Sequence, residues 1–458
     1  MPELINDFWF PNEEFPNNYS FSNAFIKNIG GNNYCNLWTK RNLYLLSKIF
    51  HIIKNQPNDV IKTQLMFGFI QCLHLCSKMC VPRRKDAKRD FSTSWGRSAF
   101  ICAKRQMEMN AVYMFIRSCL GKQSVQSSLS SATNYLKNKP IIQNINTSKK
   151  VARANLIYGI VDIKNIDAVL PHKSVDFIIT DPPYGGLIKY LDLSSIWLVW
   201  LKQYDARFTP IYAQELTVNT NKDLQKFSEE FTEGLQKLRL VLKDNATLIL
   251  TFNTQDPSVW NSFISSIANA GFNIYKMIHQ QNKRSGESNV ASSFGISASD
   301  FYVHCVKSCE TKRRILTDIE FNETVVNYFK QTLYKRNEPT NFDILFAGVL
   351  TYLSENNIDL TDCTTRIKDA LSKHIDSSLV LTKTQSGIKW GLTQFNKNKK
   401  TLTDKVKLLI DFEVSRKKHI DKNIIIAKVY NTFSNELAPD PLTLKNLICN
   451  IEKGDTNE

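Results

Sequence analysis

The stretch from Val175 to Tyr190 constrains the fold more than any other part of this chain. It reads VDFIITDPPYGGLIKY, an apolar and β-branched run that ends at Asp181-Pro182-Pro183-Tyr184. Such a run is typical of a buried strand. Two successive prolines remove two backbone donors and disfavour the α conformation before each ring, so the chain must leave the sheet in a stiff, extended turn. The two glycines that follow allow close backbone approach, and the apolar run from Leu187 to Trp200 predicts a helix.

Composition bounds the class of protein. The 458 residues predict two or three domains, and 42% hydrophobic with 22% charged residues is ordinary for a globular protein. No apolar run is long enough to span a bilayer, and the acidic start MPELINDFWFPNEE lacks a signal-peptide pattern. The ten cysteines form no secreted framework. We therefore expect a cytoplasmic location and no membrane partner.

The charge points to a polyanionic partner. The net charge is +16 and the pI near 9.2, although lysine-rich and asparagine-rich genomes also raise the pI. Cations interleaved with aromatics crowd the stretch VPRRKDAKRDFSTSWGRSAFICAKRQ, a pattern that suits phosphate contacts and base stacking. A solvated charged loop is the alternative. The candidate nucleic-acid residues are Arg83, Arg84, Lys85, Lys88, Arg89, Trp95 and Arg97.

The region before residue 150 is expected to be an aromatic arm followed by helices. Thr39 is a candidate N-cap for a helix that runs through Ile53. A second helix is expected from about Ile61 to Met79, and it carries Cys72, Cys76 and Cys80 at four-residue spacing. We favour a stripe of buried thiols over a zinc site, because ligands on one straight helix face close a tetrahedron poorly. A helix is expected from Gln106 to Cys119, and a surface linker from Gln123 to Lys149.

Strands and helices then alternate, which predicts a parallel, doubly wound sheet. A short strand, Asn155 to Val161, ends at Asp162. After the helix that follows the turn, the expected elements are a helix from Lys222 to Lys243, a strand from Ala246 to Asn253, a helix that begins at Asp256, and strands at Phe272 to His279 and Asp300 to Lys307. From about Asn322 the pattern is helical and polar.

An Asp-Pro-Pro-Tyr turn after a hydrophobic strand resembles the catalytic motif of the amino-methyltransferases that methylate N6 of adenine or N4 of cytosine in DNA. The elements LWTKRNL, VDFIITDPPYGG, YLDLSSIWLVWL and LRLVLKD are similar to a bacterial subfamily, from about Leu37 to Lys307. The resemblance implies S-adenosyl-L-methionine as cofactor and DNA as partner. It also accounts for the closing strand pair, which fits the antiparallel hairpin at the sheet edge of these enzymes.

The resemblance gives the motif residues roles. Asp181 and the carbonyl of Pro182 would accept the hydrogens of the exocyclic amine, whose lone pair is otherwise delocalised into the ring. Pro183 belongs to the same catalytic motif, and Tyr184 would stack on the base once it has left the duplex. Asp162 would lie at the methyl donor's edge of the site. A loop carboxylate is the alternative for Asp162, as a plain strand-ending turn is for the motif.

One departure from the family is marked. Those enzymes carry a Phe-x-Gly-x-Gly turn that wraps the cofactor, and no Gly-x-Gly occurs in this sequence. We expect either a second polypeptide that carries this glycine-rich motif or a truncated or decayed enzyme, and we favour the split enzyme.

The fold class expected is α/β, a partly incomplete Rossmann-like methyltransferase sheet with a helical N-terminal insertion and a helical C-terminal accessory domain. The expected domains are residues 1–150 (arm and basic helical region), 151–310 (catalytic core) and 311–458 (accessory domain). The expected function is S-adenosylmethionine-dependent DNA methylation, with adenine N6 favoured over cytosine N4. A non-catalytic DNA-binding or regulatory subunit and an RNA methyltransferase stay open as alternatives.

Overall fold

The computed structural model describes residues 7–18, 20–82, 91–93, 100–137, 142–144, 156–219, 222–254, 256–280, 300–308, 313–384, 387–415, 422–433, 437–440 and 443–448. The chain forms two compact units. One comprises Met1–Ile160 with Gly185–Asp223, and the other Val161–Tyr184 with Leu224–Glu458. Within the described ranges no helix is long and apolar enough to cross a membrane.

The first unit is mainly helical. Its elements are α1 (Asn23–Ile29), η2 (Tyr34–Leu37), α2 (Lys40–Lys54), α3 (Asp59–Leu75), β1 (Cys80–Pro82), β2 (Phe91–Thr93), α4 (Ala111–Leu120), α5 (Val125–Leu136), β3 (Ile142–Asn144), β4 (Leu156–Tyr158), α7 (Tyr190–Tyr204), η4 (Ala206–Phe208) and η5 (Tyr212–Gln214). Trp200 of α7 is fully buried and meets the rings of Trp38, Phe50 and Phe69 edge-on, so α7 packs in the core of this unit.

Several expectations for this unit are confirmed and two need correction. Thr39 caps α2 by accepting a hydrogen bond from the Asn42 amide. The thiols of Cys72, Cys76 and Cys80 are buried, but α3 ends at Leu75 and Cys80 lies in β1, so they do not share one helix. The stretch interpreted as a linker contains α5, which begins after its N-cap Ser124.

The second unit holds the sheet. Its elements are η3 (Ile163–Asn165), α6 (Ile166–Val169), β5 (Val175–Thr180), α8 (Leu224–Val241), β6 (Leu242–Phe252), α9 (Pro257–Asn269), β7 (Phe272–Gln280), β8 (Asp300–Lys307), α10 (Asp318–Arg336), β9 (Thr340–Asn341), α11 (Phe342–Glu355), α12 (Cys363–Ser372), β10 (Leu379–Thr384), β11 (Gly387–Leu392), α13 (Leu402–Ser415) and α14 (Lys422–Thr432).

The four-stranded sheet has the order β5-β6-β8-β7. β5 runs parallel to β6, whereas β8 is antiparallel to both β6 and β7. The sheet is therefore mixed rather than parallel throughout, and the antiparallel β7–β8 pair expected at its edge is confirmed. Pro257 at the start of α9, its N-cap Asp256 and the left-handed Gly271 (φ 81°) after its end also match the sequence.

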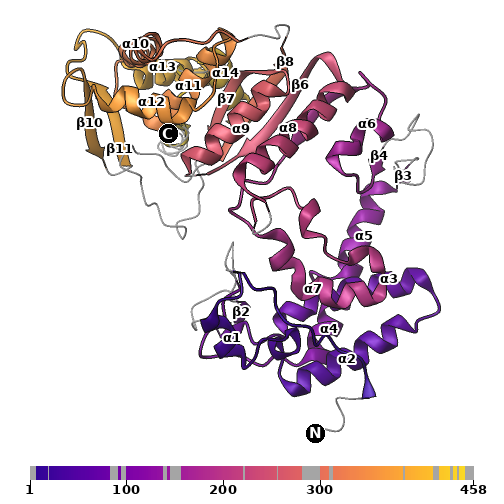
Figure 1. The fold of residues 1–458 in the computed structure, drawn as a ribbon. Helices are drawn as coiled ribbons and strands as arrows, with labels where there is room; N and C mark the ends of the chain where they lie inside the picture. The colour runs from indigo at the N-terminus through magenta and orange to yellow at the C-terminus, as the bar shows by residue number, and fades with distance from the viewer. Residues whose placement is uncertain are drawn as a thin grey trace. The chain divides into compact units, whose positions relative to one another are not determined.

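Helices α8 and α9 cover one face of this sheet (Figure 1). Phe252 of β6 stacks on Phe263 of α9 with 3.7 Å between ring centroids, and Phe263 stacks in turn on Phe231 of α8. Leu248, Leu250 and Phe252 alternate along β6 and are fully buried on this face. The sheet and its two helices thus share one core.

The part after β8 is not purely helical. The hairpin of β10 and β11, extended by β9, lies within the region that was expected to be helical, and Trp390 on β11 is fully buried against Phe329 and Phe342. The capping box of Thr317 and Glu320 begins α10. The helical pattern expected after about Asn322 does hold at α11 and α14, where apolar residues recur at helical spacing.

Candidate active site

The Asp-Pro-Pro-Tyr turn begins at Asp181, directly after β5 ends at Thr180. Asp181 is exposed and the Pro182 ring is buried, so the turn is anchored in the protein while its carboxylate faces outward. The ring of Tyr184 meets Phe252, the last residue of β6, edge-on with 5.2 Å between centroids. The turn therefore lies at the carboxyl ends of two parallel strands, where open α/β sheets bind their ligands.

Two hydroxyl groups orient the carboxylate of Asp181. The Tyr184 hydroxyl donates to Oδ1 at 2.5 Å, and the Thr251 hydroxyl donates to the same oxygen. Thr251 reaches it because Thr180 pairs with Leu250 in the β5–β6 ladder, so Thr251 lies beside Asp181. Within the described ranges no hydrogen bond falls on Oδ2. One oxygen is thus held and the other is placed to accept from a ligand.

The glycines after the motif fit the tight turn that the sequence indicates. Gly185 has φ 60°, a left-handed conformation that favours glycine, and its carbonyl accepts from the Val218 amide at 3.2 Å. A Cβ on Gly186 would lie only 3.0 Å from the Val218 carbonyl oxygen. A side chain at Gly186 would therefore push the chain away from residue 218.

The other sequence candidates are not gathered at this turn. Pro183 is half-buried within it. Asp162 is exposed, and its carboxylate accepts from the Lys164 amide at 2.9 Å to cap η3. Arg83, Arg84, Lys85, Lys88, Arg89, Trp95 and Arg97 lie outside the residues that the structure describes, so their contact with nucleic acid stays a prediction.

A buried carboxylate that sequence reasoning missed lies in the first unit. Asp192 of α7 accepts from the Asn18 amide at 3.0 Å and from the Ser20 hydroxyl at 2.6 Å. It lines a cavity of about 190 Å³ together with Tyr212 and Glu215. Burial, with the charge of Asp192 beside it, raises the pKa of the Tyr212 phenol well above its usual range. An acidic position in an apolar helix, within YLDLSSIW, was the available signal.

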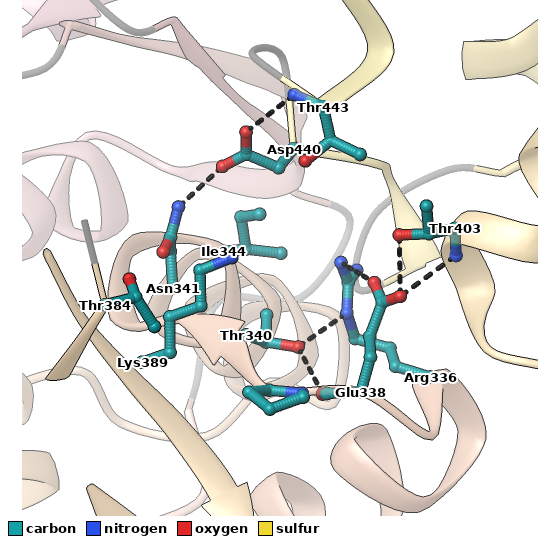
Figure 2. Close-up of a pocket in the computed structure, with 11 residues that line it drawn as sticks. Arg336, Glu338, Thr340, Asn341, Ile344, Thr384, Lys389, Thr403, Asp440 and Thr443 are labelled. Carbon is teal, nitrogen blue, oxygen red and sulfur yellow. Dashed lines mark hydrogen bonds and ion pairs between the residues drawn. The ribbon is translucent and has the colours of Figure 1, made fainter. Parts of the chain in front are cut away.

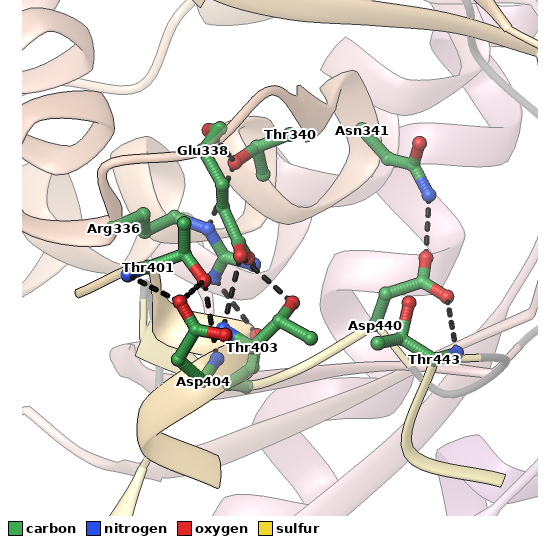
Figure 3. Close-up of polar contacts among 10 residues, drawn as sticks. Arg336, Glu338, Thr340, Asn341, Thr401, Thr403, Asp404, Asp440 and Thr443 are labelled. Atoms are coloured by element: carbon green, nitrogen blue, oxygen red, sulfur yellow. Dashed lines mark hydrogen bonds and ion pairs between the residues drawn. The ribbon is translucent and has the colours of Figure 1, made fainter. Parts of the chain in front are cut away.

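A second cavity, of about 240 Å³, lies in the second unit among α11, β9, β11 and the segment around Asp440 (Figure 2). The guanidinium of Arg336 is buried beside it and donates to the Thr340 hydroxyl at 2.8 Å and the Ala438 carbonyl at 2.9 Å. Glu338 pairs with Arg336 and also accepts from the amide and hydroxyl of Thr403 (Figure 3). Arg336 and Glu338 are therefore engaged with each other, and Asp440 accepts from the Asn341 side chain and the Thr443 amide.

The comparisons with known proteins follow this geometry. A family model described as DNA methylase matches residues 175–432, more than half of the chain. The chain belongs to the DNA methylase family. The match begins at the first residue of β5 and includes the whole Asp-Pro-Pro-Tyr turn, so the resemblance drawn from the sequence is confirmed. No curated protein matches this DNA methylase chain.

Solved structures similar to this DNA methylase chain include a protein from Thermus thermophilus named as a DNA modification methylase. It is 10% identical with a TM-score of 0.21, and the match covers 41% of this chain and 63% of that one. The same protein complexed with S-adenosyl-L-methionine is 12% identical over 42% of this chain and 66% of that one, with a TM-score of 0.21. PvuII DNA methyltransferase (cytosine-N4-specific) is 11% identical, with coverages of 47% and 92% and a TM-score of 0.22. The chain thus spans just under two thirds of the Thermus protein, and membership rests on the family model.

Proposed function

We propose that this chain is the catalytic half of a DNA amino-methyltransferase, acting on N6 of adenine, with a second polypeptide that completes the cofactor site. The observation that carries this proposal is the turn itself: an exposed carboxylate, oriented on one oxygen, at the ends of β5 and β6. In this proposal β5, β6, β8 and β7 form one half of a Rossmann-like methyltransferase sheet.

Asp181 has the geometry that an amine substrate requires. Its Oδ2 accepts one hydrogen of the exocyclic amino group, and the Pro182 carbonyl accepts the other, as the family likeness implies. These two bonds draw the nitrogen towards tetrahedral geometry and localise its lone pair. Because the donors on Oδ1 hold the carboxylate in place, little reorganisation is needed as charge develops.

Tyr184 is suited to hold the base. The contact with Phe252 fixes its ring, and the bond from its hydroxyl to Asp181 fixes the ring's rotation relative to the carboxylate. A base turned out of the duplex would stack on such a ring beside the acceptor of its amine. Base capture and amine activation are therefore coupled through adjacent residues of one turn.

The cofactor of this function is S-adenosylmethionine, which carries a methyl group on a sulfonium. The described residues do not complete a site for it. β5 has no strand on its outer side among them, and the sequence contains no Gly-x-Gly turn whose backbone could approach the cofactor closely. Asp162 stays a candidate for the methyl donor's edge of the site. Because the described residues do not supply this side of the cofactor site, we propose a second polypeptide.

The test is methyl transfer to DNA by the full chain, alone and with the product of a neighbouring reading frame that encodes a strand followed by Phe-x-Gly-x-Gly. We expect labelled N6-methyldeoxyadenosine in digests only when both proteins are present, and none with Asp181→Ala. Labelled N4-methyldeoxycytidine in its place would show that the target base is cytosine and not adenine. Label in RNA alone, or none with any such partner, would contradict the function.

Calorimetry separates the two halves of the proposal. The isolated chain should show no stoichiometric binding of S-adenosylmethionine, yet it should bind DNA with an affinity that falls as salt rises. Tight cofactor binding by the isolated chain would contradict the need for a partner and leave the methylation itself intact.

A further inference from the structure

The strand that bears the active-site turn is covered less than its neighbour. Phe177 is 52% exposed and Ile179 is 62% exposed, although the sequence predicts a buried strand. Leu248 and Leu250 of β6, by contrast, are fully buried. The expectation of a buried strand is therefore wrong for the described chain, and the reason is a missing cover on one side of β5.

The exposed side chains share one face of the sheet. Phe177 pairs with Thr247 and Ile179 with Ile249, so these residues lie on the face opposite to α8 and α9. Further along the same face Ile249 pairs with His304 of β8, and Thr251 pairs with Tyr302, which pairs in turn with Ile278 of β7. Tyr302 and Ile278 are half-buried, so the exposed large apolar side chains on this face are those of β5.

The backbone of β5 is open in the same place. Among the described residues β5 pairs only with β6, so the groups along its outer edge have no strand beside them. In a parallel ladder every second residue directs both its N–H and its C=O to one side. Parallel strands are usually covered on both faces, and an edge with apolar residues is a template for a further strand.

We propose that the outer edge and exposed face of β5 are the docking surface for the second polypeptide, which adds a strand parallel to β5 and lays a helix over Phe177 and Ile179. This inference rests on the proposed function and names the surface of this chain that the second polypeptide would bind. The added strand would end beside Asp181, so a glycine-rich turn at its carboxyl end would form the second wall of the ligand crevice.

Other occupants fit the surface less well. DNA needs cations, whereas Phe177, Ile179 and Ile249 are apolar and Asp176 and Asp181 flank them. A second copy of this chain would bring no Gly-x-Gly turn and would leave the crevice incomplete. A strand with its own apolar helix satisfies the open backbone edge and the apolar face together.

The test uses full-length chains and the same neighbouring product as the probe. The double variant Phe177→Asp/Ile179→Asp should weaken its binding about a hundredfold, because both charges would be buried at the centre of the contact. The matched control is Phe412→Asp/Ile319→Asp, whose side chains are 54% and 73% exposed on α13 and α10. The control should bind like the wild type. Equal binding by both double variants would overturn the proposal.

Hydrogen exchange locates the contact. The amides of residues 175–180 that exchange fast in the isolated chain should become protected when the product is added. Protection of all of them in the isolated monomer would mean that this chain covers its own edge, and protection with dimerisation would mean that a second copy does. Either result would overturn the proposal.

Binding of the neighbouring product can be measured independently of catalysis. Asp181→Ala should bind the product with unchanged affinity while it fails to methylate. Binding without methylation by the wild-type pair would contradict the proposed function and leave the docking surface standing. Methylation by this chain alone would contradict the docking surface and leave the methylation activity standing.

Discussion

Two polar regions of the second unit differ in whether the hydrogen-bonding groups of their charged residues are already used by neighbours. The Arg336 guanidinium is 1% exposed and directs its donors to Thr340, Ala438 and Glu338. The Asp181 carboxylate is exposed, and both hydrogen bonds to it within the described ranges fall on one oxygen. The first region uses its polarity to hold segments together, whereas the second retains an acceptor for a ligand.

This difference teaches that a cavity is not by itself a functional site. The larger cavity lies beside Arg336, yet Arg336, Glu338 and Asp440 of its charged lining are already held by neighbours. The turn at Asp181, by our proposal, carries the chemistry. Each prediction below tests whether a residue belongs to the holding region or to the reacting one.

Arg336→Met should cause the largest loss of stability. It leaves the half-buried carboxylate of Glu338 without its cation and the Ala438 carbonyl without its donor, so the free energy of unfolding should fall by about 3 kcal/mol. Denaturant melts of the full chain measure this. Lys335→Met, at the exposed neighbouring position, is the control and should change it by less than about 0.5 kcal/mol. A melt of Arg336→Met that matches the control would contradict the holding role.

Asp181→Asn should lower methyl transfer strongly and leave stability almost unchanged, the opposite of Arg336→Met. The shape of the side chain is kept and a charged acceptor is lost, so methyl transfer should fall about a hundredfold. Because Asp181 is exposed, the free energy of unfolding should change by less than about 0.5 kcal/mol. Single-turnover assays and denaturant melts on one preparation give both numbers. Near-normal turnover would remove the catalytic assignment.

Tyr184→Ala should weaken base capture by about 1–3 kcal/mol, the worth of one stacked base. Tyr184→Phe should preserve base capture, because the ring remains, and should lose no more than the fivefold in kcat expected for Thr251→Val, since only the hydrogen bond to Asp181 is lost. The measurement is kcat/KM for DNA in the active assembly. A phenylalanine variant as poor as alanine would mean that the hydroxyl, and not the ring face, carries the role.

Thr251→Val should have the smallest effect. Thr251 acts through Asp181, so losing its hydrogen bond should lower kcat about fivefold, equivalent to about 1 kcal/mol. The Kd for DNA should stay unchanged, since Thr251 positions the acceptor and does not hold the base. Thr251→Ser keeps the hydroxyl and should restore kcat. Failure of serine to rescue would indicate a packing role for the methyl group.

The sequence predicted the elements whose signals are local. The apolar run before Asp181, the cap at Asp256 and the strand pair at Phe272 and Asp300 all appear where their residues indicate. It did not predict α5, because the apolar positions Val125, Leu129, Ala132 and Leu136, although at helical spacing, lie within a serine-rich run that was interpreted as a linker. Nor did it predict the hairpin that holds the buried Trp390, since the region after about Asn322 was interpreted as helical.

The sequence also could not predict the parts of the site that depend on pairing between residues far apart in the chain. Thr251 is one of several threonines, and only the register of β6 against β5 brings it to Asp181. The exposure of Phe177 and Ile179 could not be read from the sequence either, because an apolar strand looks the same whether or not its cover is present.

The uncovered strand has a consequence for the cell that makes this protein. If the proposed second polypeptide covers β5, chains produced in excess of it would carry an apolar edge able to pair with any other strand, which is a route to aggregation and proteolysis. Balanced synthesis of the two polypeptides, as from one transcript, would then limit the time for which β5 stays open. Overproduction of this chain by itself should therefore lower its soluble yield, and supplying the partner at the same time should raise it.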